Sequence, residues 1–316
     1  MKRRTFVGST LATMVMPGLS ESGVWRLVRQ DPGDIEAVTG DGRKVTLRGA
    51  AVRELSQGLG GRLLHARSEG YEAARHILNP AIDKRPALIA QPADVEGVRR
   101  AVQFARESNL LLAVKCGGHS FSGQSTCDGG LMIDLQRIRS IRVDPAARPA
   151  VVAGANLLPA VGAAAAPPAP ATPARTVSHT GVGGLTTGGG FGRLARRFGL
   201  AVDNLVGVEV VTADGRLLRA DASENADLFW GVRGGGGNFG IVTSFTFALH
   251  PMQQNVIGGE LVFPYAKARD AWEFYGEYTA ATPDERYLGI KQVIPPGGGE
   301  GAVSIDVCYS GSERDA

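Results

Sequence analysis

The spacing of apolar residues predicts short strands alternating with helices in the first half of the chain. An extended apolar stretch begins at Leu88 and meets a turn at Gln91-Pro92. Apolar residues then recur at helical spacing as far as Asn109, namely Val95, Val98, Val102 and Ala105. Apolar runs over 111–114, 131–135 and 206–211 predict strands, and Asp214-Gly215 predicts a hairpin after the last of these.

The second half of the pattern ends in a strictly alternating stretch. From Ile241 to Leu249, the residues Phe245, Phe247 and Leu249 fall on one face and Thr246 on the other, which is typical of a half-buried strand. Ser223 is a candidate N-cap for a short helix through Trp230. The order of elements predicts an α+β fold rather than a regular βαβ repeat, interrupted by glycine-dense loops at 181–192 and 231–240.

Composition and charge exclude several classes of protein. With 43% hydrophobic and 21% charged residues, the 316-residue chain is neither disordered, collagen-like nor a membrane bundle. Lys plus Arg exceed Asp plus Glu by 34 to 31, and Lys2, Arg3 and Arg4 account for that excess. A neutral remainder argues against a nucleic-acid partner. Glycine, at 44 residues, has about twice its usual share of roughly 7%.

Residues 1–20 have the order of a signal peptide, with a basic cluster ahead of a short apolar run. The run is too short to span a bilayer, so no membrane span is expected in the mature protein. Arg3-Arg4 followed by Thr5-Phe6 resembles a twin-arginine export signal, which predicts a periplasmic protein that folds and acquires its cofactor before export. The alternative of a frayed basic terminus stays open, since no clean A-x-A cleavage site follows.

Two further features concern the middle of the chain. Residues 159–175 hold five prolines and no aromatic or acidic residue, which favours a linker and suggests an altered stretch inside an otherwise continuous domain. Cys116, Cys127 and Cys308 are too few for a disulfide framework and lack zinc-site spacing. A disulfide between Cys116 and Cys127 is the alternative, but free buried thiols are favoured because the cytoplasm, where the protein would fold, is a reducing compartment.

The strand ending at Lys115 runs into the sequence CGGHSFSG, residues 116–123. Consecutive glycines after a strand can turn backbone amides inward as an anion-binding nest that suits a pyrophosphate, although paired glycines also form ordinary turns. Other nucleotide motifs fail. A G-x-G-x-x-G at 235–240 precedes a strand-like segment instead of a helix, and neither a Walker phosphate loop nor a G-x-S-x-G elbow is present.

Four segments in order give a more specific signal. They are PALIAQPADVEGVRRAVQFARE, VKCGGHSFSGQSTCDGGLMIDL, TVSHTGVGGLTTGGGFGRLARRFGLAVDNLVGVEVVTADG and NADLFWGVRGGGGNFGIVTSFTFAL. Together they resemble the FAD-linked oxidases of the vanillyl-alcohol oxidase and berberine-bridge-enzyme type over about residues 55–265. The resemblance implies a two-subdomain FAD-binding domain of the PCMH type at 55–252, after an extension at 21–54. An incomplete substrate domain built on an antiparallel sheet is expected at 253–316.

The resemblance also implies roles for single residues. Backbone amides of the first loop would bind the FAD pyrophosphate, at Cys116, Gly117, Gly118 and Ser120. His119 would be joined to the 8α-methyl group of the flavin; a neutral histidine that satisfies a turn is the alternative. The second loop would pack against the flavin and its ribityl-phosphate chain, through Ser178, Gly181, Gly183, Gly184 and Gly188. The backbone of Ile241 and Val242 would lie along the cofactor.

Two departures from the family pattern limit these expectations. Members that attach flavin twice carry a cysteine where this chain has Val177, so a single link through His119 is expected. The chain ends at Ala316, soon after an expected helix over 272–278 and a strand ending near Cys308-Tyr309, whereas family members continue further. The catalytic base therefore has no candidate, and neither His179 nor His250 is expected to fill that role.

The implied reaction is oxidation of a small organic substrate by hydride transfer to flavin, with dioxygen as the acceptor that reoxidises the cofactor. Three alternatives remain open at this point. They are a reductase or dehydrogenase of the same fold that holds FAD without a covalent bond, a protein that binds FAD without turnover, and a nucleotide-dependent transferase. No metal ion is expected at the site.

Overall fold

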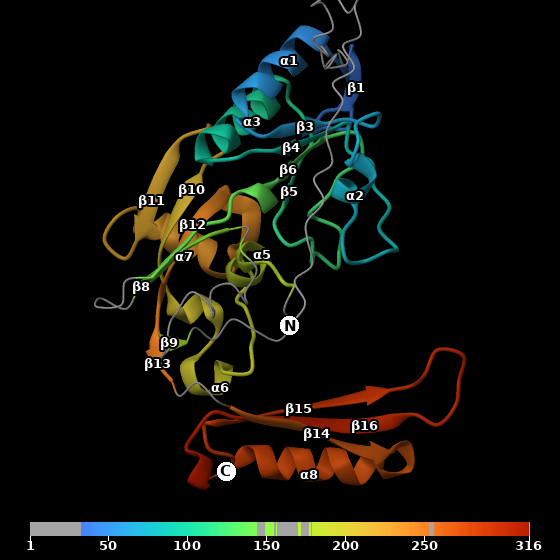
Figure 1. The fold of residues 1–316 in the computed structure, drawn as a ribbon, viewed down its shortest axis with the longest axis vertical. Helices are drawn as coiled ribbons and strands as arrows, with labels where there is room; N and C mark the ends of the chain where they lie inside the picture. Colours follow the sequence, from blue (N-terminus) through green and yellow to red (C-terminus); the bar gives the residue numbers. More distant parts are fainter. Residues whose placement is uncertain are drawn as a thin grey trace, which may run out of the picture. The chain divides into compact units, whose positions relative to one another are not determined.

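The computed structural model describes residues 33–143, 149–154, 156, 170–171, 177, 179–252 and 256–315. The expected signal at 1–20 and nearly all of the proline-rich segment at 159–175 lie outside these residues. The described part is α+β, as predicted, and Figure 1 shows its helices and strands along the chain. Among the described residues, no helix combines the length and the apolar character needed to cross a membrane.

The first subdomain is built on a four-stranded sheet in the order β3-β4-β6-β5. The strands are β3 (Arg62–Leu64), β4 (Leu88–Gln91), β5 (Leu112–Lys115) and β6 (Leu131–Asp134), and β6 runs parallel to both β4 and β5. Helix α3 (Val95–Glu107) begins where the Asp94 side chain accepts a hydrogen bond from the Gly97 amide at 2.9 Å. Its buried face contains Val98, Val102 and Ala105, which confirms the predicted helix.

Elements before residue 62 belong to the same core. The hairpin of β1 (Ile35–Val38) and β2 (Lys44–Leu47) buries Ala37 and Leu47, and helix α1 (Gly49–Gly58) buries Val52 and Leu55. Figure 1 shows α1 beside α3, with which it is in contact. The expected boundary between residues 54 and 55 thus falls inside α1. Helix α2 (Tyr71–Arg75) packs with a smaller core group on β4 and β6.

The second subdomain holds a five-stranded antiparallel sheet in the order β11-β10-β12-β8-β7. Its strands are β7 (Ile141–Val143), β8 (Pro149–Ala153), β10 (Leu205–Val211), β11 (Leu217–Asp221) and β12 (Ile241–Ala248). The hairpin predicted at Asp214-Gly215 joins β10 to β11, and Gly215 has a φ of +81°. Phe245 and Phe247 are buried and Thr246 is half-buried, which confirms the predicted alternation.

Helix α7 (Ala226–Gly235) corrects the cap predicted at Ser223. The residue that precedes α7 is Asn225, which has a φ of +48° and makes no side-chain cap. Ser223 instead donates to the Asp221 carboxylate, from its amide at 2.8 Å and from its hydroxyl at 2.7 Å. Because the carboxylate at the end of β11 is a strong acceptor, the serine is held in a turn and does not cap the helix.

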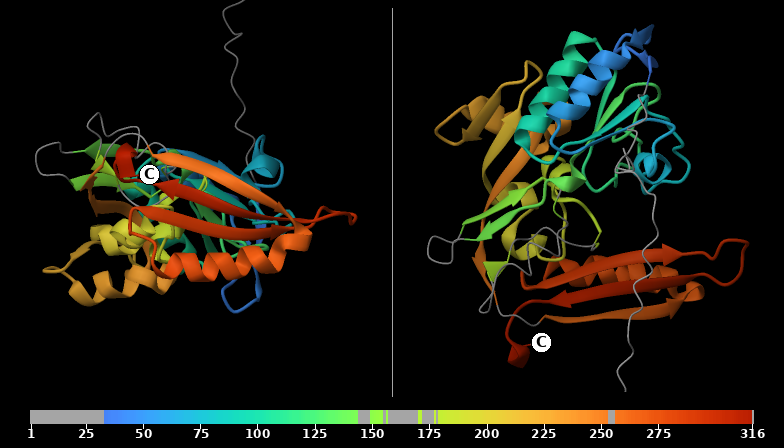
Figure 2. Two further views of the ribbon diagram at one scale, coloured as in Figure 1. Left: turned by 90° about the horizontal axis from the view of Figure 1, so that it is seen from below. Right: turned by 45° about the horizontal axis from the view of Figure 1, so that its top comes forward.

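A third sheet follows, in the order β14-β16-β15, with all strands antiparallel. Strands β14 (Ile257–Pro264), β15 (Arg286–Val293) and β16 (Ala302–Tyr309) are packed on one face by helix α8 (Ala268–Ala280), as Figure 2 shows. The helix expected over 272–278 and the strand expected to end near 308–309 are both confirmed. Two short strands, β9 (Pro170–Ala171) and β13 (His250–Pro251), pair with each other.

Candidate functional site

The two predicted glycine loops touch each other through their backbones. The first loop, residues 116–123, follows β5, and the second loop, residues 178–192, contains helix α5 (Val182–Thr187). A Cβ atom added to Gly117 would lie 2.4 Å from the Gly181 amide nitrogen, and one added to Gly181 would lie 2.5 Å from the Gly117 nitrogen. Since any side chain at either position would push the loops apart, both residues must be glycine for this contact to form.

The first loop is held in shape by its own hydrogen bonds. Gly118 has a φ of +70°, in the left-handed region that glycine favours, and its carbonyl accepts a bond from the Leu78 amide at 2.9 Å. Ser120 Oγ accepts a bond from the Gln124 amide at 3.0 Å. These contacts hold the residues from Cys116 to Ser120 in place at the end of β5.

A buried ion pair lies at the base of the first loop. Lys115 and Asp134 face each other at the ends of β5 and β6, with Nζ and Oδ2 3.9 Å apart, and Gln91 donates to the same carboxylate at 3.0 Å. Burial lowers the pKa of Lys115 and raises that of Asp134, and the opposite charge of the partner works against each shift. The sequence did not predict this ion pair, although each charged residue is the last residue of a mainly apolar strand.

The Cys116 thiol packs between the two loops. A Cβ on Gly183 would lie 2.6 Å from Cys116 Sγ. Burial raises the pKa of this thiol to about 12, and a hydrogen bond from the Gly184 backbone acts in the opposite direction. Cys116 is therefore a thiol at neutral pH, unsuited to nucleophilic attachment. Cys116, Cys127 and Cys308 are all free, as favoured from the sequence.

The second loop has room that the described chain does not fill. A Cβ on Gly184 would have no described atom within 4 Å, and one on Gly188 would lie 3.2 Å from the Gly184 carbonyl oxygen. The Thr186 hydroxyl is buried without a hydrogen-bond partner among the described residues. Ser178 lies outside them. The open space beside Gly184 fits a loop that a ligand approaches closely.

His119 extends from the first loop toward a histidine of the second. Its Nε2 lies 2.7 Å from Nδ1 of His179, and the two ring centroids are 4.7 Å apart with the planes inclined at 36°. Burial lowers the pKa of His119, and the neighbouring His179 lowers it further. Sequence reasoning gave His179 no role. By contrast, His250 stacks on Phe198 with centroids 4.4 Å apart, which suits a structural role.

Ile241 and Val242 open the strand that joins the two subdomains. Their backbone pairs with β10, at Val211 and Val210 respectively. The Ile241 side chain belongs to the core of the first subdomain and the Val242 side chain to the core of the second. These two residues therefore fix the subdomains to each other along this strand.

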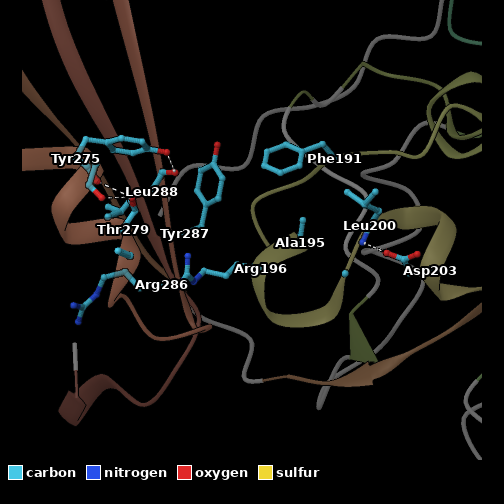
Figure 3. Close-up of a pocket in the computed structure, with 13 residues that line it drawn as sticks. Phe191, Ala195, Arg196, Leu200, Asp203, Tyr275, Thr279, Arg286, Tyr287 and Leu288 are labelled. Atoms are coloured by element: carbon cyan, nitrogen blue, oxygen red, sulfur yellow. Dashed lines mark hydrogen bonds between the residues drawn. The ribbon is translucent and has the colours of Figure 1, made fainter. Parts of the chain in front are cut away.

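A pocket of about 530 Å³ borders the end of the second loop, at Phe191. Helix α6 (Ala195–Phe198) and residues on either side of it line one side of the pocket, and α8 and β15 line the other, as Figure 3 shows. Phe191 and Tyr287 approach each other with ring centroids 5.9 Å apart, and an ion pair of 2.8 Å links Arg193 to Asp306 nearby. None of the residues predicted to bind the cofactor lines this pocket.

Comparison with known proteins supports an FAD site. A family model described as an FAD binding domain matches residues 86–221. An FAD-linked oxidoreductase of Dictyostelium discoideum is 35% identical over 264 residues, which are 83% of this chain and 57% of that protein. The (R)-6-hydroxynicotine oxidase of Paenarthrobacter nicotinovorans is 34% identical over 201 residues, 63% of this chain and 43% of the oxidase.

Solved structures share the fold. A 6-hydroxy-D-nicotine oxidase from Arthrobacter nicotinovorans aligns with a TM-score of 0.77 and 27% identity, covering 82% of this chain and 57% of the other. A xylooligosaccharide oxidase from Myceliophthora thermophila, in complex with xylobiose, gives 0.75 and 28%, covering 84% and 56%. The chain thus spans little more than half the length of these structures. In sequence, fold and FAD-binding domain, the chain belongs to the FAD-linked oxidases of the vanillyl-alcohol oxidase and berberine-bridge-enzyme type.

Proposed function

We propose that this protein is an FAD-dependent oxidase that transfers a hydride from a small organic substrate to a covalently bound flavin, with dioxygen as the final acceptor. The contact between Gly117 and Gly181 is the observation that carries the proposal. It holds two loops against each other, with His119 on the first loop and the open space at Gly184 on the second.

The chain's own residues would bind and orient the cofactor. Backbone amides from Cys116 to Ser120 form a turn suited to the pyrophosphate. The space beside Gly184 would admit the cofactor close to the backbone. When bound, the isoalloxazine ring supplies the hydride acceptor that no amino-acid side chain provides.

A single covalent bond, at His119, fits the remaining residues. Val177 stands where a second attachment would need a cysteine, and the Cys116 thiol, with a pKa raised to about 12, is not ionised at neutral pH. The names of the relatives point to substrates as different as a hydroxynicotine and a xylooligosaccharide. We therefore propose the substrate only as a small organic molecule.

The location of the flavin after denaturation tests the proposal. In the purified protein, acid precipitation should leave flavin absorbance in the pellet, whereas the His119→Ala pellet should be colourless and its flavin should appear in the supernatant. Gly118→Val should bind little FAD at all, because valine disfavours a φ of +70° and its Cβ would lie 3.3 Å from the Lys115 side chain. Wild-type flavin found wholly in the supernatant would identify a non-covalent protein. Bound flavin that no substrate reduces would identify a protein without turnover.

A further inference from the structure

The carbonyl groups and the amides of the first loop differ in their partners. Three carbonyl oxygens each accept a hydrogen bond from residues 78–84, namely those of Gly118, Phe121 and Gly123. By contrast, the backbone amides from Gly117 to Ser120 donate to no acceptor in the part of the chain that the structure describes. Carbonyl groups that are already bonded, next to amides that are not, are the arrangement that a backbone anion site requires.

Two of these bonds come from side chains of residues 76–84, which follow α2 and which we call the bracing segment. Asn79 Nδ2 donates to the Phe121 carbonyl at 2.8 Å, and Lys84 Nζ donates to the Gly123 carbonyl at 3.3 Å. The third bond comes from a backbone amide of the same segment. Substitution of Asn79 or Lys84 can therefore remove a bond to the first loop without altering the backbone.

The bracing segment is itself held at its two ends by Arg75, the last residue of α2. The Arg75 side chain, which is 4% exposed, forms ion pairs with Glu72 at 2.7 Å and with Asp83. It also donates a hydrogen bond to the Lys84 carbonyl at 3.2 Å. Because a buried arginine joins the start of the segment to its end, the segment can support the first loop from a fixed position.

A second hydrogen bond orients the Asn79 side chain. Its Oδ1 accepts from the Ala81 amide at 3.1 Å, so its Nδ2 is the atom that faces the Phe121 carbonyl. We propose that Asn79 and Lys84 are positioning residues, which hold the carbonyl groups of the first loop so that its amides are left for the FAD pyrophosphate. This inference rests on the FAD site proposed above. A loop restrained in this way loses less freedom when FAD binds, so the restraint should raise the affinity for FAD.

Asn79→Ser tests the first side-chain bond. Serine keeps an oxygen that can accept from the Ala81 amide, but it is too short to donate to the Phe121 carbonyl. Flavin-free protein, from a host starved of riboflavin, is titrated with FAD under nitrogen, where covalent attachment has no oxidant, and fluorescence quenching gives the Kd. One hydrogen bond is worth about a two- to tenfold change in an equilibrium constant. The Kd of Asn79→Ser should therefore rise by about two- to tenfold.

Asn225→Ser is the matched control. Asn225 Nδ2 also donates to a backbone carbonyl, that of Arg219 at 2.6 Å, but it lies at the start of α7. This variant should lose unfolding free energy and keep the Kd of the wild type. Lys84→Met should also raise the Kd for FAD, whereas Lys84→Arg, which keeps a charged donor, should bind FAD nearly as the wild type does.

Backbone order parameters separate positioning from direct contact with FAD. In flavin-free Asn79→Ser, the ¹⁵N order parameters of the Ser120 and Phe121 amides should fall below the value of about 0.85 that marks a rigid backbone. Weaker FAD binding with unchanged order parameters would overturn the positioning role, because Asn79 would then contact FAD itself. An unchanged Kd in Asn79→Ser, or an equal rise in Asn225→Ser, would refute the inference and leave the FAD site standing. If the wild type binds no FAD, the FAD site and the inference are both refuted.

Discussion

Alanine at position 117 would separate the two loops whose contact organises the site. The new methyl group would lie 2.4 Å from the Gly181 nitrogen and 2.8 Å from its Cα. Carbon atoms in favourable contact lie about 3.5–4.0 Å apart, so the loops must move by about 1 Å. The atoms in the way belong to the backbone and cannot rotate aside. Gly117 does not have a positive φ, so the contact alone should account for the effect.

The size of the effect follows from the local packing. Forcing an extra methyl group into a packed region costs about 1–3 kcal/mol of unfolding free energy. Gly184→Ala is the matched control, because its methyl group would have no described atom within 4 Å. Gly184 lies inside α5, where alanine is preferred over glycine by about 1 kcal/mol. The two substitutions should therefore change stability in opposite directions.

Urea unfolding of the flavin-free variants, followed by circular dichroism, measures this difference without the added stability that bound FAD would confer. Gly117→Ala should also retain less flavin than wild type when purified with its cofactor. Because either methyl group opens the same contact, Gly117→Ala and Gly181→Ala should together cost less than the sum of their separate effects. An unchanged urea midpoint and full flavin content in Gly117→Ala would refute the backbone contact.

Three other changes test different parts of the chain. Lys115→Met should lower the unfolding free energy by about 3–5 kcal/mol because it leaves the Asp134 carboxylate buried without its partner; an added Asp134→Leu should recover most of the loss in a urea titration. The pKa of Cys116, raised from 9.0 to about 12, means that the unfolded chain loses this proton first. The free energy of unfolding should therefore fall as the pH rises from 9.0 to about 12. In Cys116→Ala this fall should be less steep. Lysine at both Arg3 and Arg4 should retain the precursor in the cytoplasm, and undiminished periplasmic delivery would argue against twin-arginine export.

The local pattern of apolar and polar residues was sufficient to predict the long elements of the fold. The apolar spacing from Val95 to Ala105 identified α3, and the alternation around Phe245 identified β12, because each buries one face on a large core. The hairpin of β1 and β2 was not predicted, since its four-residue strands bury few side chains and carry little pattern. The predicted N-cap at Ser223 was wrong because the nearby Asp221 carboxylate accepts the hydrogen bonds of this serine. The capping preference of serine does not reveal that competition.

Some features of the candidate site could be predicted from local sequence, and others depend on contacts between distant residues. Both glycine loops stand out in the sequence because glycine is concentrated there. Their mutual contact, and the pairing of His119 with His179, depend on a chain reversal across 60 residues that no local pattern records. The Lys115 and Asp134 pair is intermediate, since Lys115 ends one predicted strand and Asp134 lies near the end of another, but their adjacency required the parallel order of β5 and β6.

The glycines of the second loop fall into two groups, and the division bears on how the cofactor binds. Gly181 and Gly183 meet backbone or sulfur atoms of the first loop, so the chain itself requires them. Gly184 meets nothing in the described structure, so its lack of a side chain serves something other than internal packing. The contacts that align His119 with His179 are therefore made by the chain's own atoms. If the proposed covalent bond forms at His119, His119→Ala should remove that bond and leave reversible FAD binding in place.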